Sequence, residues 1–288
     1  MERISEQAPA KINLTLQVVG RRGDGYHFLR SLVGFADVGD VIHFTPSKEL
    51  SLEVSGPFAK ELSGSNLADN LVMRAAKKLL DVCGRKQGAE LHLIKNLPVA
   101  SGIGGGSADA AATLRGLGRL WAVSDVTDDK MRSLSLSLGA DVPVCLQSKC
   151  TWMEGIGEKL SVGPRLPDLY TVLLNPGIAV STPNIFKNLG GAFSFGMHKP
   201  DAFSSLGDFK NYLGLVGNDL QNPACELEPI IAEALFELRE QENCVLSGMS
   251  GSGATCFGIF DSKEHAELAA RTIKLKHSDW WLCPTVVR

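Results

Sequence analysis

The glycine-rich segment Pro98-Val-Ala-Ser-Gly-Ile-Gly-Gly-Gly-Ser-Ala108 constrains this chain more than any other feature. It follows residues 90–95, whose apolar and polar side chains alternate as in a strand, and it precedes the alanine- and leucine-rich residues 107–121, which predict a helix. Glycine lets a backbone approach an anion closely, and the N–H groups at a helix N-terminus donate readily to phosphate. The segment therefore predicts a phosphate-binding turn, with a strand-to-helix turn that binds nothing as the alternative.

Two common nucleotide-binding motifs do not fit this segment. A P-loop requires a lysine directly after its last glycine, and no lysine follows Gly106. The dinucleotide-binding fingerprint requires a third glycine where this chain has Ser107. If the segment binds phosphate, it belongs to a different kind of phosphate site.

The composition is that of an ordinary globular protein. The 288 residues are 44% hydrophobic and 21% charged, enough for one large domain or two smaller ones. A formal net charge of −3 argues against nucleic-acid binding, which usually needs a basic excess. Seven cysteines without a Cys-x-x-Cys pair predict reduced thiols. With no signal-peptide pattern and no long apolar run, we expect a cytoplasmic protein that does not span a membrane.

Apolar periodicity divides the first half of the chain into short elements. Residues 11–19 alternate and predict one strand, while residues 28–44 predict a strand and hairpin broken at Gly39-Asp40. Residues 69–83 carry apolar side chains at helical spacing and predict an amphipathic helix. Residues 127–139 predict another helix, which ends at a glycine.

The second half opens at the proline-rich residues 163–167, which predict a joint between domains. Residues 225–241 predict one long helix, and residues 192–210 show no regular pattern. The order of elements is strand, helix, strand, strand, helix, strand, which is typical of a ferredoxin-like α+β sandwich. The expected strands are residues 169–174, 244–246, 255–260 and 281–287, and the second helix is residues 263–274.

Three segments resemble, in order, the motifs of the GHMP family of small-molecule kinases. They are Ala8-Pro-Ala-Lys-Ile-Asn-Leu14, the glycine-rich segment 98–108, and Gly248-Met-Ser-Gly-Ser-Gly-Ala-Thr255. In the second motif, Ile103 stands where leucine is common and Gly106 where the first serine is common. Because the three motifs span most of the chain, the resemblance is specific.

The resemblance implies a two-domain α+β architecture. It places a ribosomal-S5-like N-terminal domain in residues 1–163 and a ferredoxin-like C-terminal domain in residues 164–288. It also implies ATP and Mg²⁺ as cofactors, and ATP chemistry itself favours a magnesium ion. Ser107 is one candidate magnesium ligand, but the acidic ligand of the family has no obvious counterpart here.

The resemblance assigns the ATP-binding residues. The phosphates are expected at Pro98, Val99, Ala100, Ser101, Gly102, Ile103, Gly104, Gly105, Gly106, Ser107 and Ala108. Adenine is expected near Asn66, Leu67 and Asn70, which a loop and a helix cap would explain equally well. Residues 250–253 are expected to pack a second glycine turn against the first, or to form a tight turn for purely structural reasons.

Asp141 and Lys11 are the candidate catalytic residues. In the segment Gly139-Ala-Asp-Val-Pro143, Asp141 resembles the family's general base, although aspartate between glycine and proline also favours turns. Lys11 shares one face of an alternating strand with Asn13. Its ammonium would keep Asp141 ionised and stabilise the transferring phosphoryl group, unless it is a solvated edge-strand lysine. The resemblance implies that Lys11 and Asp141 act together.

The acceptor side resembles the family members whose small-molecule substrate carries a diphosphocytidyl group. The segment Arg22-x-Asp-Gly-Tyr26-His27 implies that Tyr26 and Phe186 stack on the cytosine while His27 reads its edge. Thr182 is expected near a substrate phosphate, and Asn13 is assigned with these substrate-binding residues. Tyrosine and phenylalanine are also ordinary core residues.

Two other functions compete with this interpretation. One is another kinase of the same family, acting on homoserine or mevalonate, whose acceptors have no cytidine to stack. The other is an RNA-binding module without catalysis, because the N-terminal fold resembles a domain of ribosomal proteins and elongation factors. The absence of a basic stripe argues against RNA.

Overall fold

The computed structural model describes residues 3–64, 66–84, 86–124, 126–191 and 193–288. The chain forms two compact units that interleave along the sequence. Unit 1 comprises Met1–Ala10, Gly39–Val99 and Gly104–Ser148, and unit 2 comprises Lys11–Val38, Ala100–Ile103 and Lys149–Arg288. Strands β1 (Ile4–Asn13) and β3 (His27–Ser47) each contribute to both units. The proposed domain boundary at residues 163/164 stays a prediction.

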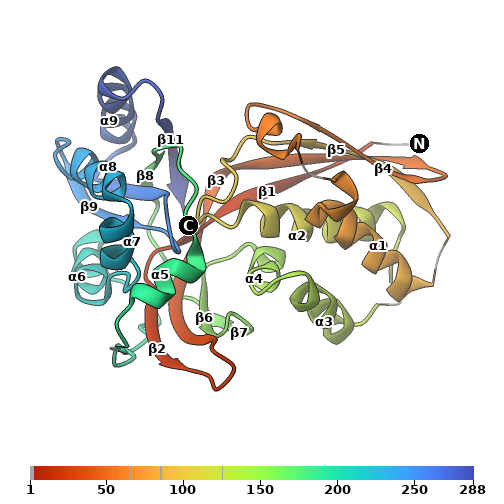
Figure 1. Cartoon of the computed structure of the whole chain (residues 1–288), viewed down its shortest axis with the longest axis horizontal. Helices are drawn as coiled ribbons and strands as arrows, with labels where there is room; N and C mark the ends of the chain where they lie inside the picture. The colour runs from red at the N-terminus through yellow and green to blue at the C-terminus, as the bar shows by residue number, and fades with distance from the viewer. Residues whose placement is uncertain (1–2, 65, 85, 125, 192) are drawn as a thin grey trace. The chain divides into compact units, whose positions relative to one another are not determined.

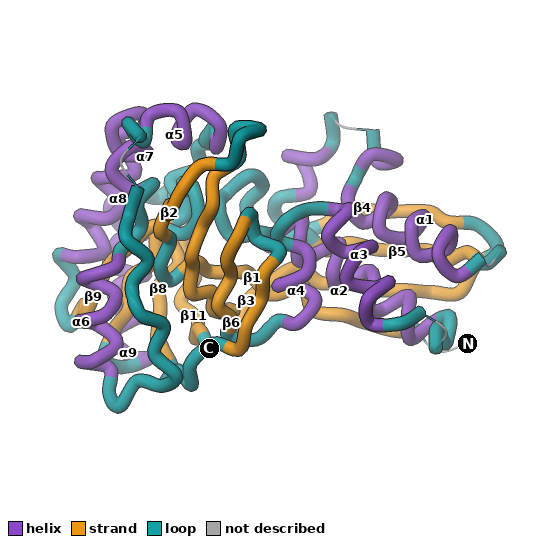
Figure 2. Tube along the Cα trace, turned by 90° about the horizontal axis from the view of Figure 1, so that it is seen from below, coloured by secondary structure: helices purple, strands orange, loops and turns teal. Residues whose placement is uncertain are grey.

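Unit 1 packs helices against a small sheet. The second half of β3 pairs antiparallel with β5 (Gly88–Ile94), and β5 pairs parallel with β4 (Leu50–Ser55). Helices α1 and α2 lie on one face of these strands, as the two views show together (Figures 1 and 2). The helices are α1 (Leu71–Cys83), α2 (Gly105–Leu120), α3 (Asp128–Leu138) and α4 (Val142–Gln147), with short 3-10 turns η1 (Ala59–Leu62) and η2 (Leu67–Asp69).

Local capping explains where the helices of unit 1 begin and end. The Asn70 side chain accepts a hydrogen bond from Val72 N–H and starts α1, while Gly84, at a φ of 63°, ends it. Thr127 caps α3 in the same way, and Gly139 follows its last residue. These ends confirm the predicted helices. In α2, Gly116 has no room for a side chain because the ring of Phe44 on β3 fills that space.

Unit 2 contains four neighbouring antiparallel strands in the order β11-β8-β10-β9, and Val287 of β11 also pairs with Ala36 of β3 in the same sheet. If these four strands are numbered by their order along the chain, their order in the sheet is fourth, first, third, second. Helices α8 and α9 pack on this sheet (Figure 1). The ferredoxin-like prediction is therefore confirmed. The strands are β8 (Leu169–Asn175), β9 (Cys244–Met249), β10 (Cys256–Phe260) and β11 (Trp281–Val287), and the helices are α5 (Thr182–Asn188), α6 (Leu206–Val216), α7 (Gln221–Leu227), α8 (Pro229–Arg239) and α9 (Lys263–Lys276).

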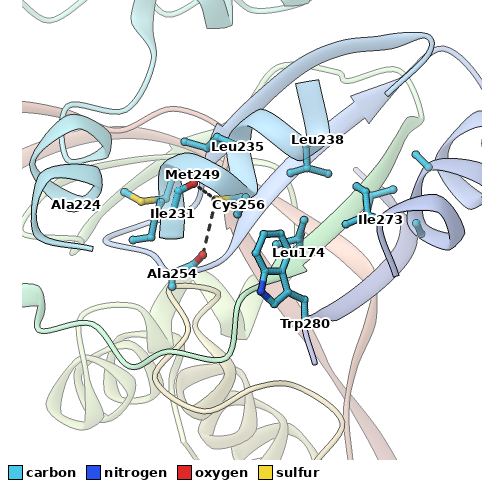
Figure 3. Packing of buried hydrophobic residues seen from close by; sticks show 14 of the residues in the cluster. Leu174, Ala224, Ile231, Leu235, Leu238, Met249, Ala254, Cys256, Ile273 and Trp280 are labelled. Carbon is cyan, nitrogen blue, oxygen red and sulfur yellow. Dashed lines mark hydrogen bonds between the residues drawn. The ribbon is translucent and has the colours of Figure 1, made fainter. Parts of the chain in front are cut away.

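The core of unit 2 lies between this sheet and its helices (Figure 3). Leu174 of β8 and Ile273 of α9 are fully buried there, and Trp280 is 2% exposed. The thiol of Cys256 donates long hydrogen bonds to the carbonyl groups of Ile231 and Ala254. All seven cysteines lie in the described ranges, and none forms a disulfide, as the sequence predicts.

The first half of β3 also belongs to unit 2. It pairs with β2 (Gln17–Arg21) on one side and with β6 (Thr151–Gly155) on the other, and β6 pairs in turn with β7 (Lys159–Val162). The sequence did not predict β6 or β7. In the described part of the chain, no helix is long and apolar enough to cross a membrane.

The predicted hairpin within residues 28–44 is wrong, because β3 continues through Gly39 and Asp40 without a turn. Gly39 serves close packing: a Cβ there would collide with the carbonyl group of Ala8. Asp40 is buried and accepts hydrogen bonds from the N–H groups of Asn96 and Leu97. Glycine and aspartate are common in turns, but here Gly39 and Asp40 make contacts with segments that are distant in sequence.

Three other predictions need correction. The single helix at 225–241 is two helices, α7 and α8, because Pro229 lacks an N–H group and holds Glu228 at an extended ψ of 84°. The single strand at 11–19 is broken between β1 and β2, where Leu16 makes a bridge to Asn218. The supposedly irregular residues 192–210 include the start of α6, which Ser205 caps.

Candidate active site

The part of the glycine segment in unit 2, Ala100–Ile103, is held rigidly by a second glycine turn. The Ser250 hydroxyl donates to the carbonyl oxygen of Gly102 at 3.0 Å, and Thr255 N–H donates to the carbonyl oxygen of Ser101 at 3.1 Å. Gly102 has a φ of 77°, and a Cβ on it would lie 2.6 Å from the carbonyl oxygens of both Ser250 and Gly253. The predicted packing of one glycine turn against the other is therefore confirmed.

The part of the segment in unit 1 starts α2. Gly104, at a φ of 64°, occupies the N-cap position, and Gly105, Gly106 and Ser107 form the first turn. No side chain caps this end of α2. The first N–H groups of a helix have no partner within the helix, so this turn offers donors and a positive dipole end to an anion.

A buried charged triad, which the sequence analysis missed, lies under this first turn. Lys95 Nζ donates to Asp40 Oδ2 at 2.5 Å and to Asp109 Oδ2 at 2.7 Å. A Cβ placed on Gly105 would lie 3.2 Å from the same Lys95 nitrogen. Burial, opposed by Lys95 and reinforced by Asp40, raises the pKa of Asp109 to about 7. Lys95 lies within the apolar run 91–97 and Asp109 within the apolar run 108–112. A charged residue inside an apolar run was the sequence signal that could have revealed this triad.

The predicted adenine-site residues are also helix caps. Asn66 accepts a hydrogen bond from Ala68 N–H at the start of η2, and Asn70 accepts one from Val72 N–H at the start of α1. Leu67 lies between them and is 37% exposed. Capping thus accounts for both asparagines, and their nucleotide role stays a prediction.

Lys11 and Asn13 lie inside unit 2, so Lys11 is not a solvated edge-strand residue. Lys11 is 4% exposed, and its Nζ donates to Asn13 Oδ1 at 2.9 Å. The Asn13 amide nitrogen donates to the Ser31 hydroxyl at 2.7 Å, and Asn13 N–H donates to the Ser250 hydroxyl at 3.0 Å. Asn13 therefore joins Lys11 to the second glycine turn.

Asp141 lies in unit 1, at the N-cap position of α4. Its carboxylate does not cap that helix, which counts against a purely turn-forming role. The turn that carries it, Gly139–Asp141, lies beside the first turn of α2: a Cβ on Gly139 would be 3.9 Å from Ser107 Oγ. Unit 1 therefore brings Asp141 and the phosphate segment into one neighbourhood.

A cavity of about 670 Å³ in unit 2 collects most of the predicted acceptor-binding residues. Tyr26 reaches it from the turn between β2 and β3, His27 from the first position of β3, and Thr182 and Phe186 from α5. The analysis from sequence missed further lining residues, among them Arg21, Lys187 and Phe193. Arg21 belongs to the basic pair Arg21-Arg22, which lies just before the Asp-Gly-Tyr-His segment. That pair was the sequence signal that could have revealed a cation in this cavity.

Aromatic rings organise this cavity. His27 stacks on Phe186 with ring centroids 4.8 Å apart and planes 19° apart, and Phe193 tilts toward His27 at 6.5 Å. Tyr26 is 62% exposed at the cavity edge, and the guanidinium carbon of Arg22 lies over its ring at 5.5 Å from the ring centroid. Burial, with a smaller effect of Arg21, lowers the pKa of His27 below its ordinary value of 6.5. His27 is therefore neutral at physiological pH.

Thr182 connects this cavity to the second glycine turn, since its hydroxyl and that of Ser252 lie 2.7 Å apart within hydrogen-bonding distance. No group of three His, Cys, Asp or Glu side chains in the described ranges is arranged to hold a metal ion.

Comparison with known proteins identifies two family domains. The model described as "GHMP kinases N terminal domain" matches residues 70–149, and "GHMP kinases C terminal" matches residues 201–278. A relative from Paramagnetospirillum magneticum, named 4-diphosphocytidyl-2-C-methyl-D-erythritol kinase, is 45% identical over 99% of this chain and 98% of its own length.

Two solved structures are similar over nearly the whole chain. A crystal structure of 4-(cytidine 5'-diphospho)-2C-methyl-D-erythritol kinase has a TM-score of 0.80 and 30% identity, with 99% of both chains covered. A homoserine kinase from Cytophaga hutchinsonii has a TM-score of 0.69 at 17% identity, covering 99% of this chain and 96% of its own. At that identity, the second likeness concerns the fold alone.

Proposed function

Because this chain belongs to the GHMP kinase family, we propose that it transfers the terminal phosphoryl group of ATP to the 2-hydroxyl group of 4-diphosphocytidyl-2-C-methyl-D-erythritol. This reaction is a step of the non-mevalonate route to isoprenoid precursors. Near-complete coverage of the relative from P. magneticum, at 45% identity, supports the choice of this acceptor over homoserine or mevalonate.

The cavity lined by Tyr26, His27, Thr182 and Phe186 is the single observation that carries this proposal. A pyrimidine needs a flat apolar face and a polar group at its edge. Phe186 supplies the face, Tyr26 supplies a second ring, and neutral His27 supplies both a donor and an acceptor nitrogen. Small acceptors such as homoserine carry no base that could stack on these rings.

The cations of the same cavity suit the diphosphate of this acceptor. Arg21 and Lys187 line the cavity beside the rings, and Thr182 adds a hydroxyl donor. Cationic side chains form strong, charge-assisted hydrogen bonds with phosphate oxygens. Base stacking and phosphate binding within one cavity explain how a cytidine diphosphate group would be held.

We assign the transfer step to Asp141 and Lys11. Asp141 would accept the proton of the acceptor hydroxyl as the new P–O bond forms. Lys11 would stabilise negative charge on the transferring group, and its hydrogen bond to Asn13 fixes the direction of the ammonium. Phosphoryl transfer depends mainly on positioning the reactants and stabilising charge. A base at the acceptor hydroxyl and a cation at the transferring group would meet both needs.

The nucleotide phosphates would bind residues 98–108, with adenine near Asn66 and Leu67. The unpartnered N–H groups of the first turn of α2 and the tight approach at Gly102 support this placement. Bound Mg²⁺ would neutralise phosphate charge. In this chain, the Ser107 hydroxyl lies within the same turn and would be an oxygen ligand of the right type.

We also propose that the reaction takes place in the cytoplasm. All seven cysteines are in the described ranges and none forms a disulfide, which is usual for proteins of a reducing compartment. Burial raises the pKa of Cys150 to about 12 and that of Cys244 to about 11, so these thiols resist oxidation.

A coupled ADP-release assay tests the proposal with three acceptors side by side: the diphosphocytidyl compound, homoserine and mevalonate. We expect ADP release that depends on the first compound only. Turnover with homoserine or mevalonate, and none with the cytidine compound, would contradict the proposed substrate. Salt-sensitive RNA retention without turnover on any acceptor would instead favour a binding module.

A further inference from the structure

Asn218 and Asp219 lie in the short connection between α6 and α7 of unit 2, outside the three family motifs. Both residues are partly buried. The backbone of this connection is anchored to the break between β1 and β2. Leu16 N–H donates to the carbonyl oxygen of Gly217 at 3.0 Å, and Asp219 N–H donates to that of Leu16 at 2.8 Å. From this anchored backbone, the side chains of Asn218 and Asp219 bind two different parts of unit 2.

Asn218 holds the second glycine turn. Its amide nitrogen donates to the carbonyl oxygen of Met249 at 2.7 Å and to that of Gly251 at 2.9 Å, which uses both of its N–H groups. Its amide oxygen accepts a hydrogen bond from Leu220 N–H at 2.9 Å, which fixes the orientation of the amide group. A Cβ on Gly251 would lie 2.8 Å from the carbonyl oxygen of Gly102. Asn218 therefore fixes the turn at the point where it packs against the phosphate segment.

Asp219 completes a ring of three hydrogen bonds beside the acceptor cavity. Val18 N–H of β2 donates to Asp219 Oδ2 at 2.7 Å, and the Ser194 hydroxyl donates to Asp219 Oδ1 at 2.9 Å. Ser194 N–H donates in turn to the carbonyl oxygen of Val18 at 2.9 Å. Ser194 directly follows Phe193, and β2 ends at Arg21, and both Phe193 and Arg21 line the cavity. Asp219 therefore holds together two parts of the cavity wall that are distant in sequence.

The wall at Phe193 depends on such side-chain contacts. Residues 193–200 belong to no helix or strand, so no ladder of backbone hydrogen bonds fixes their position. The Phe193 ring nevertheless lies 6.5 Å from that of His27, the residue expected to read the base edge. Val18, at the other end of the ring of hydrogen bonds, is fully buried. The carboxylate of Asp219 thus joins a segment without regular structure to a rigid strand.

We propose that Asn218 and Asp219 are positioning residues for the phosphoryl transfer, Asn218 on the ATP side and Asp219 on the acceptor side. This inference rests on the proposed function, which assigns ATP to the glycine-rich segment and the acceptor to the cavity. Two adjacent residues then fix the binding elements of both substrates in unit 2 to one backbone connection. Such fixing matters for rate, because a displacement of about 1 Å between reacting groups can slow a reaction by about 100-fold.

Steady-state kinetics of the whole chain test the proposal, with the KM for each substrate measured at saturating concentration of the other. Asn218→Asp keeps the shape of the side chain and an acceptor for Leu220 N–H, but it removes both donors to the second glycine turn. We expect its KM for ATP to rise by about tenfold while its KM for the diphosphocytidyl acceptor stays unchanged. Asp219→Leu keeps a similar shape but accepts no hydrogen bond. We expect the reverse there: a KM for the acceptor that rises by about tenfold, and an unchanged KM for ATP.

Milder variants keep the test decisive if Asp219→Leu fails to fold. Ser194→Ala removes one hydrogen bond of the ring and should raise the KM for the acceptor by about three- to tenfold. Asp219→Asn should restore the KM of the unmodified chain, because its amide oxygen can accept from Val18 N–H while its nitrogen donates to Ser194 Oγ. The control Asp261→Leu removes an exposed aspartate that binds His265 beyond the opposite end of β10, and it should change neither KM.

The crossed pattern of KM values separates positioning from a general loss of stability. A purely structural role would raise both KM values together, or neither, in Asn218→Asp and in the Asp219 and Ser194 variants, and either result would overturn the inference. An acceptor KM in Asp219→Asn as high as in Asp219→Leu or Ser194→Ala would overturn it too. No turnover of the diphosphocytidyl acceptor by the unmodified chain would overturn the proposed function itself, and the inference with it.

Discussion

The contact between the two glycine turns of unit 2 makes a quantitative prediction for Gly102→Ala. Gly102 has a φ of 77°, a region that costs a residue with a Cβ about 1–2 kcal/mol. The new methyl group would also lie 2.6 Å from two backbone carbonyl oxygens, where overpacking typically costs about 1–3 kcal/mol. The sum predicts a loss of about 2–5 kcal/mol in the free energy of unfolding.

Two control variants separate these contributions. Gly177 has nearly the same φ, 78°, but nothing within 4 Å of an added Cβ, so Gly177→Ala should lose only the backbone contribution of about 1–2 kcal/mol. Gly118 lies in α2 with open space around it, and Gly118→Ala should be neutral or gain about 0.5–1 kcal/mol.

Urea unfolding followed by circular dichroism measures all three variants at equal protein concentration. We also expect the KM for ATP to rise in Gly102→Ala, because the phosphate segment must move to make room, and to stay unchanged in the two controls. A loss in Gly102→Ala no larger than in Gly177→Ala would refute the reasoning that close approach of the two turns holds the phosphate segment.

Three further predictions concern the proposed chemistry. Asp141→Asn should keep ATP affinity, measured by calorimetry, while kcat falls by about 10²–10⁴ through loss of the general base; near-normal kcat would exclude that role. Phe186→Ala should raise the KM for the cytidine acceptor by about five- to 150-fold, because stacking on a base contributes about 1–3 kcal/mol, and an unchanged KM would remove Phe186 from the base site. Since burial lowers the pKa of His27 below 6.5, His27 stays neutral above that pH and takes a proton only as the pH falls through its lowered value. The acceptor KM should therefore be flat above about pH 6.5 and rise below it, and a His27→Gln variant should lack that rise; the same rise in this variant would assign it to another group.

Local signals in the sequence predicted much of the fold. Helix α1 begins at a capping asparagine and ends at a left-handed glycine, and both signals are within one turn of the helix ends. The strand and helix order of unit 2 was equally readable, because alternation and helical spacing are local patterns. The break between α7 and α8 had a local signal too, in Pro229, but the apolar spacing on either side of it outweighed that signal.

Features that depend on distant partners were not readable. Gly39-Asp40 has the residue types of a turn, yet Asp40 binds backbone groups more than fifty positions away. Lys95 is the polar end of an alternating strand, and its burial depends on Asp40 and Asp109, which are distant in sequence. Four residues of the acceptor cavity were found through the family resemblance, namely Tyr26, His27, Thr182 and Phe186. Other lining residues, among them Arg21, Lys187 and Phe193, were missed.

The identity of the phosphorylated product tests the central claim most directly. After reaction of the chain with ATP and the diphosphocytidyl acceptor, proton-coupled ³¹P NMR distinguishes the position of the new phosphomonoester. The 2-hydroxyl group is on a tertiary carbon, which bears no hydrogen, so we predict a new resonance without three-bond coupling to a proton. A doublet or triplet from a secondary or primary ester, or no new phosphomonoester at all, would contradict the proposed reaction.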